Sequence, residues 1–212
     1  FDSKTYNYWS DVIKIIFPII KEHGIDIVQI GTEGDPEFPY CLRTSGATNI
    51  NQTAYILKNS MLHLGADSFP VHVASSYGKK IVALYGNSYN KNAYPFWSKE
   101  EDVRLLEANR EFLKPSFAPQ ESPKSINLIS PEKVAKSVLD LLEIKHNINQ
   151  ETLFSGTLFS PDNMVYETTL EDVVDTQSMG LEKILCRLDF NHDEKILEQQ
   201  LQISRCELIA DK

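Results

Sequence analysis

The sequence has few of the features that mark disulfide-rich, metal-binding or membrane-spanning proteins. Its 212 residues include only three cysteines, Cys41, Cys186 and Cys206, which are far apart and form no C-x-x-C or metal-ligand spacing. Reduced thiols in a cytoplasmic protein are therefore expected instead of a disulfide framework. The apolar runs are only a few residues long, which is too short for a membrane span, and the start has no signal-peptide pattern.

Basic residues are also scarce. The chain has 21 Lys and Arg against 30 Asp and Glu, which gives a formal net charge of −9. This balance argues against a nucleic-acid partner and against adhesion to an anionic membrane. No G-x-x-x-x-G-K-[ST] segment occurs, so phosphoryl transfer by a P-loop is disfavoured.

The charge is divided unevenly along the chain, and this predicts two modules. Residues 1–145 hold 16 basic and 17 acidic side chains and nine of the ten prolines, whereas residues 146–212 hold 5 basic and 13 acidic side chains. The polar stretch 145–150 lacks periodicity and is the expected boundary. The first residue is Phe1 and not methionine, which favours a fragment or a processed chain.

Hydrophobic periodicity in the first module alternates between helical and strand patterns. It predicts helices over 8–23, from Asn49 or Asn51 to 58, over 69–77 and from Ser130 to 142, and strands over 25–30, 61–65, 81–85 and 103–107. The expected fold class is α/β, with a Rossmann-like parallel sheet and flanking helices. Ligands of such sheets bind beyond the carboxyl ends of the strands, so loops 31–37, 66–72 and 86–96 are expected to carry the chemistry.

One strand-to-helix turn has the composition of an anion site. Asp67 and Ser68 fall near the first turn of the helix predicted over 69–77, where backbone N–H groups and the positive end of the helix dipole face outward. His72 lies on the same first turn and could donate a hydrogen bond to a phosphate. The alternative is that Asp67 and Ser68 only cap the helix, since this pair often begins helices.

Three consecutive blocks of the first module carry a family resemblance. The segments 45–57 (SGATNINQTAYIL), 65–74 (GADSFPVHVA) and 78–86 (GKKIVALYG) resemble the C-terminal half of the heptosyltransferase family, family nine of the glycosyltransferases. The resemblance covers about residues 8–145. It implies one half of a glycosyltransferase-B fold that binds a nucleoside diphosphate sugar, commonly ADP-heptose, for transfer to a glycan acceptor. No Asp-x-Asp motif occurs, so transfer without a metal ion or other cofactor is expected.

The resemblance also implies roles for particular residues. The loop around Asp67 would hold the diphosphate and the sugar, Glu33 would bind the ribose, and the loop after Gly86 would lie near the phosphates. The implied donor-binding residues are Glu33, Asp67, Ser68, Phe69, His72, Asn87 and Ser88. The alternatives are a solvated loop for Glu33, a packing role for His72, and plain turn residues at 87–88.

The chain departs from the family pattern in two respects. Phe69 stands where the family usually has glycine, which lets the backbone approach a pyrophosphate closely. The acceptor half, which usually supplies the catalytic carboxylate, has no counterpart here, and no catalytic residue is identified. Two alternatives therefore stay open: a non-catalytic structural or interaction module on a retained fold, and another two-domain nucleotide-sugar enzyme such as an epimerase.

The second module, residues 146–212, is expected to be a partial α/β extension. Its pattern predicts a hairpin around 155–156, strands over 183–190 and 206–210, and a helix over 193–203. Asp189, His192 and Asp193 suggest either a metal site or, more simply, a strand end followed by a helix cap. The acidic balance predicts a solvated face, with a protein partner or self-association through 146–212 as the alternative.

Overall fold

The computed structural model describes residues 2–110, 113–152, 163–167, 173–181, 183–188 and 193–209. Backbone contacts divide the chain into two compact units, Phe1–Thr152 and Leu153–Lys212. Each unit is described by itself. Among the described residues, no helix combines the length and the apolar character that a bilayer crossing would need.

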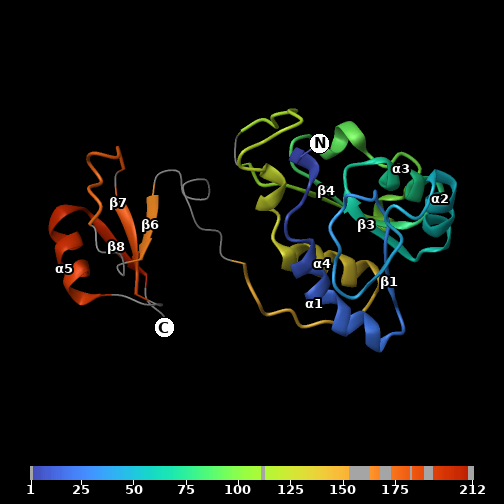
Figure 1. The fold of residues 1–212 in the computed structure, drawn as a ribbon, viewed down its shortest axis with the longest axis horizontal. Helices are drawn as coiled ribbons and strands as arrows, with labels where there is room; N and C mark the ends of the chain where they lie inside the picture. The colour runs from blue at the N-terminus through green and yellow to red at the C-terminus, as the bar shows by residue number, and fades with distance from the viewer. Residues whose placement is uncertain are drawn as a thin grey trace. The chain divides into compact units, whose positions relative to one another are not determined.

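The first unit alternates strands and helices, as its sequence pattern predicts (Figure 1). Its longer helices are α1 (Trp9–Glu22), α2 (Ile50–Asn59), α3 (Phe69–Ser76) and α4 (Pro131–Leu141). Its strands are β1 (Ile27–Gln29), β2 (Cys41–Arg43), β3 (Leu62–Ala66), β4 (Lys80–Tyr85) and β5 (Val103–Glu107). Short 3₁₀ helices are η1 (Asp2–Lys4), η2 (Asn90–Ala93), η3 (Glu100–Asp102) and η4 (Ser125–Leu128).

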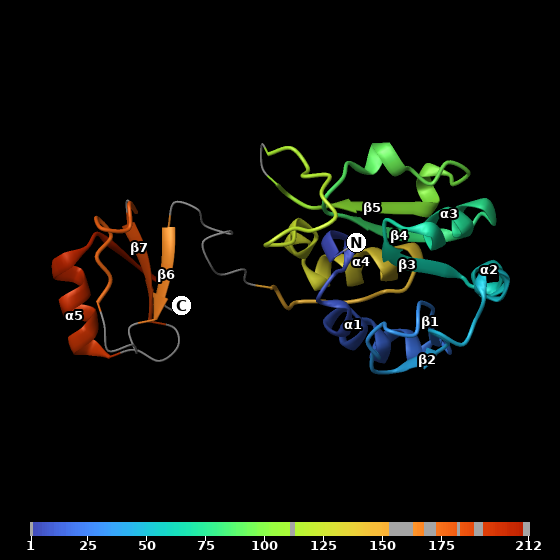
Figure 2. The same cartoon turned by 45° about the horizontal axis from the view of Figure 1, so that its top comes forward.

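All strand pairs of the first unit are parallel, which confirms the predicted α/β class. β4 lies between β3 and β5, with Gly65 opposite Ala83 and Ala83 opposite Leu105. β1 and β2 form a separate parallel pair. Parallel strands end at one edge, so the loops that follow β3, β4 and β5 meet there (Figure 2).

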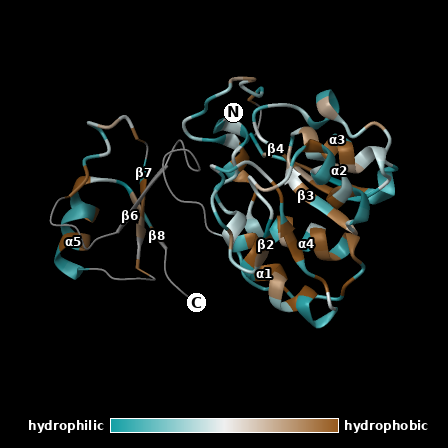
Figure 3. Ribbon diagram, turned by 45° about the vertical axis from the view of Figure 1, so that its right-hand side comes forward, coloured by the Kyte–Doolittle hydropathy of each residue, from teal (hydrophilic) through white to brown (hydrophobic). Residues whose placement is uncertain are grey.

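Two apolar layers hold the central sheet, one on each face. Val82 and Leu84 of β4 pack with residues of α1 and α4, whereas Ile81 and Ala83 pack with Leu57 of α2 and with α3. This alternation follows from the two-residue period of a strand. Figure 3 shows hydrophobic and hydrophilic segments alternating along α1 and α4, as expected of helices with one face on a core.

Local sequence signals explain several element ends. Asn49 caps α2: its Oδ1 accepts the Gln52 N–H at 3.0 Å, and the Gln52 Oε1 accepts the Asn49 N–H at 2.9 Å. This reciprocal pair satisfies two donors that a helix start leaves open. The short strand β2 was not predicted, because its three residues are partly or largely exposed and show no apolar period.

The second unit contains a three-stranded parallel sheet in the order β6-β7-β8. β6 is Asn163–Glu167, β7 is Lys183–Arg187 and β8 is Cys206–Ile209, and the helix α5 (Glu194–Ile203) joins β7 to β8. Ile184 and Cys186 are fully buried and pack near Ile196 and Leu197 of α5. The strand–helix–strand prediction is confirmed, and β6 adds a third strand that the sequence pattern did not predict.

A buried side-chain amide links α5 to the backbone of Val174 in the second unit. Gln200 of α5 is fully buried, and its side chain both accepts from the Val174 N–H at 2.6 Å and donates to the Val174 carbonyl at 2.7 Å. Asp193 caps α5 by accepting the N–H groups of Lys195 and Ile196. The hairpin expected around 155–156, and Asp189 and His192 of the metal alternative, lie outside the described residues.

Candidate functional site

The predicted anion site lies at the carboxyl edge of the central sheet, where β3 leads into α3. Asp67 follows β3, and its N–H donates to the Leu84 carbonyl of β4 at 3.0 Å. This bond fixes the turn to the neighbouring strand. Ser68 is the N-cap residue, and no side chain caps the helix start. Its hydroxyl donates to the Ala66 carbonyl at 3.0 Å instead.

Of the first three residues of α3, only Phe69 keeps an open backbone donor among the described contacts, because the Val71 N–H donates to the Ser68 carbonyl at 3.1 Å. The first N–H groups of a helix lack intrahelical partners and carry the positive end of its dipole. Pro70 contributes no N–H but fits the first turn. Phe69 is 48% exposed and belongs to neither core cluster of the unit, so its ring is not part of the packed interior.

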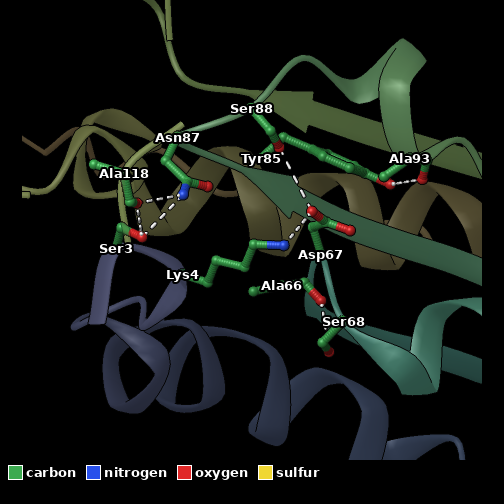
Figure 4. Close-up of polar contacts among 10 residues, drawn as sticks. All are labelled: Ser3, Lys4, Ala66, Asp67, Ser68, Tyr85, Asn87, Ser88, Ala93 and Ala118. Atoms are coloured by element: carbon green, nitrogen blue, oxygen red, sulfur yellow. Dashed lines mark hydrogen bonds and ion pairs between the residues drawn. The ribbon is translucent and has the colours of Figure 1, made fainter. Parts of the chain in front are cut away.

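A lysine that the sequence reasoning missed is placed at this turn. The Lys4 Nζ lies 2.6 Å from the Asp67 Oδ2, and the Asp67 side chain is only 8% exposed (Figure 4). The Ser88 hydroxyl, from the loop after β4, donates to the same oxygen at 3.5 Å. All of these contacts use Oδ2, so Oδ1 keeps its acceptor capacity for a hydroxyl group. Lys4 is 63 positions from Asp67, and no local pattern marks it.

Asn87 has a different environment from its neighbour Ser88. Its side chain is buried, and Nδ2 donates to the Ser3 hydroxyl at 2.9 Å and to the Ala118 carbonyl at 2.8 Å (Figure 4). Both donor hydrogens of the amide are thus used within the protein. Asn87 ties the N-terminal segment and the segment around Ala118 to the loop after β4.

Glu33 lies in a second loop, which follows β1. It is exposed, and its backbone carbonyl accepts a hydrogen bond from the Arg43 Nη2 at 3.3 Å. Gly46 packs directly against it, since a Cβ built on Gly46 would lie 2.8 Å from the Glu33 Cα. The hydrogen bonds of this loop stay within it or run to β1, β2 and the loop after β2, whereas Lys4, Asp67 and Ser88 gather at the ends of β3 and β4.

The Glu33 loop borders a buried hydroxyl. Ser45 is buried, and its Oγ has no hydrogen-bond partner. A Cβ built on Gly31 would lie 3.3 Å from this Ser45 Oγ. His72 is half-buried on α3, and its ring forms no hydrogen bond with the residues that the structure describes. The described part of the chain contains no group of three or more His, Cys, Asp and Glu arranged to hold a metal ion.

Comparisons with known proteins agree with the sequence resemblance. A family model described as glycosyltransferase family 9 (heptosyltransferase) matches residues 10–119. Lipooligosaccharide heptosyltransferase 2 of Haemophilus influenzae is 27% identical over 105 residues, which are 49% of this chain and 30% of that protein. The chain thus spans about a third of the length of this curated relative.

Two solved structures share the fold. E. coli ADP-heptose LPS heptosyltransferase II superposes with a TM-score of 0.50 at 20% identity, covering 66% of this chain and 43% of that one. A family 9 glycosyltransferase of Veillonella parvula superposes with a TM-score of 0.51 at 22% identity, covering 66% and 42%. At these identities the likeness supports the α/β fold alone.

Proposed function

Since the chain belongs to glycosyltransferase family 9, we propose that its first unit binds the nucleoside diphosphate sugar donor of a glycosyl transfer. The observation that carries this proposal is the side-chain-uncapped start of α3 beside the Lys4 ammonium and the Asp67 carboxylate. The unit would form the donor-binding half of a two-domain enzyme, and a glycan would accept the sugar. The match covers only 30% of the H. influenzae relative, so residues outside this sequence or another chain would supply the acceptor half.

The diphosphate fits the turn between β3 and α3. Its negative charge would meet the open Phe69 N–H, the positive end of α3 and the Lys4 ammonium. The half-buried His72 ring can add a donor on the same turn. Charge develops on the departing diphosphate in the transition state, and fixed donors at that position lower the barrier. This arrangement supports leaving-group stabilisation by the protein itself, without a metal ion.

The sugar and the nucleoside would occupy the flanks of the turn. The Asp67 Oδ1 has acceptor capacity for sugar hydroxyls, while its Oδ2 is held by Lys4 and Ser88. Glu33 is exposed on the loop after β1 and can accept hydrogen bonds from two ribose hydroxyls. Ser88 supports the Asp67 carboxylate and so has a positioning role.

Calorimetry with ADP- and UDP-sugars tests this proposal. Lys4→Gln and Glu33→Ala should each weaken binding by about 1–3 kcal/mol, because each removes a charged partner of the donor. Ser68→Ala should weaken it similarly, because in the complex the Ser68 hydroxyl would turn from the Ala66 carbonyl to a phosphate oxygen. Lys14→Gln is the matched control for Lys4. Lys14 is an exposed lysine that pairs with Asp11 on α1, and its loss should leave the affinity unchanged.

The outcomes separate the alternatives. Binding that persists in excess EDTA supports donor binding without a metal ion. Unchanged affinity in both Lys4→Gln and Glu33→Ala would discard the site assignment. A folded protein that binds neither nucleotide sugar would favour the non-catalytic interaction module.

A further inference from the structure

Phe117 is displayed to solvent in an unfavourable backbone conformation. Its side chain is 57% exposed, and its φ of 54° lies in the left-handed region, which bulky side chains rarely adopt. Hydrogen bonds of the Phe117 N–H and of the following carbonyl hold this conformation. The Phe117 N–H donates to the Asn87 carbonyl at 2.9 Å, and the next carbonyl, of Ala118, accepts from Ser3 and Asn87. Strain and apolar exposure both oppose folding, and such strain concentrates at functional sites.

The ring of Phe117 stands next to the Tyr89 ring, which two cations approach. Its centroid is 6.0 Å from that of Tyr89, at an interplanar angle of 63°. The Lys91 Nζ lies 5.1 Å and the Arg110 Cζ 5.6 Å from the centroid of the Tyr89 ring. Arg110 is paired with Glu107. Lys91 is exposed and makes no ion pair with any residue that the structure describes, so its charge is free for a ligand.

This cluster adjoins the candidate donor site. Asn87 accepts the Phe117 N–H, and the next residue, Ser88, contacts the Asp67 carboxylate. Tyr89 and Lys91 follow along the same loop, and Arg110 follows β5. The cluster therefore lies at the carboxyl edge on the β4–β5 side, and the start of α3 lies on the β3 side. A sugar that receives the transferred group must sit close to the donor sugar.

We propose that Phe117 is the platform on which a sugar ring of the glycan acceptor stacks, and that Lys91 binds an anionic substituent of that sugar. The proposal rests on the donor-binding function proposed above. One face of a pyranose presents several C–H groups, which bury apolar area against an aromatic ring whose face carries negative potential. The Lys91 ammonium, which forms no ion pair among the described residues, attracts a carboxylate or a phosphate. Phe117 and Lys91 would thus contribute to acceptor specificity from the donor-binding half.

Saccharide titrations followed by NMR on the full chain test this inference. The probes are methyl glucuronide, glucose 6-phosphate and the neutral methyl glucoside. The wild type should bind the two anionic probes about fivefold or more tightly than the neutral one. Phe117→Gly should weaken binding of all three by about tenfold, and Phe117→Tyr should retain it. Lys91→Gln should remove the preference for anionic probes, and Lys91→Arg should keep it.

The chain offers a matched aromatic control and a stability readout. Phe96 is 80% exposed farther along the loop that holds Lys91, where its ring packs against Trp97, and Phe96→Ser should leave saccharide binding unchanged. Phe117→Gly should not lower the melting temperature, since glycine adopts a φ of 54° without strain. Retained binding in Phe117→Gly, an equal loss in Phe96→Ser, or no response of the wild type to any probe at about 20 mM would each overturn the inference.

Nucleotide-sugar calorimetry separates this inference from the donor proposal. Phe117→Gly should keep its affinity for ADP- and UDP-sugars within about twofold. An equal loss of nucleotide-sugar and saccharide binding would place the ring in the donor site and overturn the acceptor assignment. If the wild type binds saccharides as expected but no nucleotide sugar, the donor proposal fails and the saccharide site stands.

Discussion

At the scale of single residues, two glycines determine how closely the loops after β1 and β2 approach each other. Gly46 has a φ of 74°, and a Cβ there would meet the Glu33 backbone at 2.8 Å. Gly31 is also close-packed, since a Cβ on it would collide with the Asp35 Oδ2 of its own loop and lie 3.3 Å from the Ser45 Oγ of the loop after β2. Backbone atoms cannot move aside as a flexible side chain can. The position of Glu33 therefore depends on the missing side chain of Gly46.

Gly46→Ala should weaken both the fold and the donor site. We expect the free energy of unfolding to fall by about 1–2 kcal/mol, because alanine strains the positive φ and collides with Glu33. Nucleotide-sugar affinity should fall with it, since Glu33 is displaced. Urea unfolding and calorimetry measure the two effects.

Gly24→Ala is the control for Gly46→Ala. Gly24 has a similar φ of 68°, but a Cβ there meets nothing within 4 Å. This variant should show only the conformational cost and keep its nucleotide affinity. Equal binding losses in the two variants would show that Gly46 has no specific effect on Glu33.

At the scale of elements, β3 shows how one strand serves both layers. Leu62, Leu64 and Ala66 pack toward α1 and α4, whereas His63 pairs in register with Ile81, which packs toward α2 and α3. Gly65 leaves room for the imidazole, since a Cβ there would lie 2.8 Å from the His63 Nε2. The buried Nε2 has no hydrogen-bond partner. Burial lowers the pKa of His63 from 6.5 to about 4.

The buried His63 should make the first unit sensitive to mild acid. Between about pH 6.5 and pH 4 the unfolded state binds a proton that the folded state does not, so stability falls as the pH falls. His63 does not lower the free energy of unfolding above about pH 6.5, but at about pH 5 it should have lowered it by about 2 kcal/mol. Urea unfolding at several pH values measures this slope.

His63→Leu should flatten that slope, whatever its effect on stability at neutral pH. His23→Gln is the control, because His23 is exposed at the end of α1 and its loss should leave the slope unchanged. A slope in His63→Leu as steep as that of the wild type would mean that other groups cause the acid sensitivity.

At the scale of the whole molecule, the first unit contains both loops of the candidate donor site and both apolar layers of the central sheet. Its last residue, Thr152, is held to α4. The buried Glu132 carboxylate accepts the Thr152 N–H at 2.7 Å and its hydroxyl at 2.6 Å. Burial alone would raise the pKa of Glu132, but the hydrogen bonds from Thr152, together with those from the Glu132 backbone and the Ser130 side chain, outweigh burial and lower it. The segment after the expected boundary at 145 thus contributes to the first unit.

A chain of residues 1–152 should fold cooperatively and bind nucleotide sugars within about twofold of the full chain. A chain of residues 1–145 should be less stable by about 1–3 kcal/mol, because the buried Glu132 loses both partners. Thermal unfolding and calorimetry on the two chains compare these effects. Equal stability of the two chains would contradict the role of Thr152, and an unfolded 1–152 chain would make the second unit essential.

The sequence by itself determined the elements whose side chains repeat with a clear period. The apolar runs of β3, β4 and β5, the faces of α1 and α4, and the Asn49 cap are local signals, and each was predicted close to its observed bounds. Family membership was also readable, since three blocks match in order. β2 was missed, because a short, largely exposed strand has no apolar pattern to mark it.

Only the tertiary structure decided which distant side chains meet at the carboxyl edge. Lys4 reaches Asp67, Asn87 uses its amide on Ser3 and Ala118, and Phe117 stands beside Tyr89. Asp67, Asn87 and Phe117 follow β3, β4 and β5, whose ends the parallel sheet brings together, and Ser3 and Lys4 of the N-terminal η1 reach the same edge. Sequence patterns report local conformation and burial, whereas such contacts depend on how whole elements pack. The donor-binding roles of the seven residues named from the sequence stay predictions that the binding experiments will test.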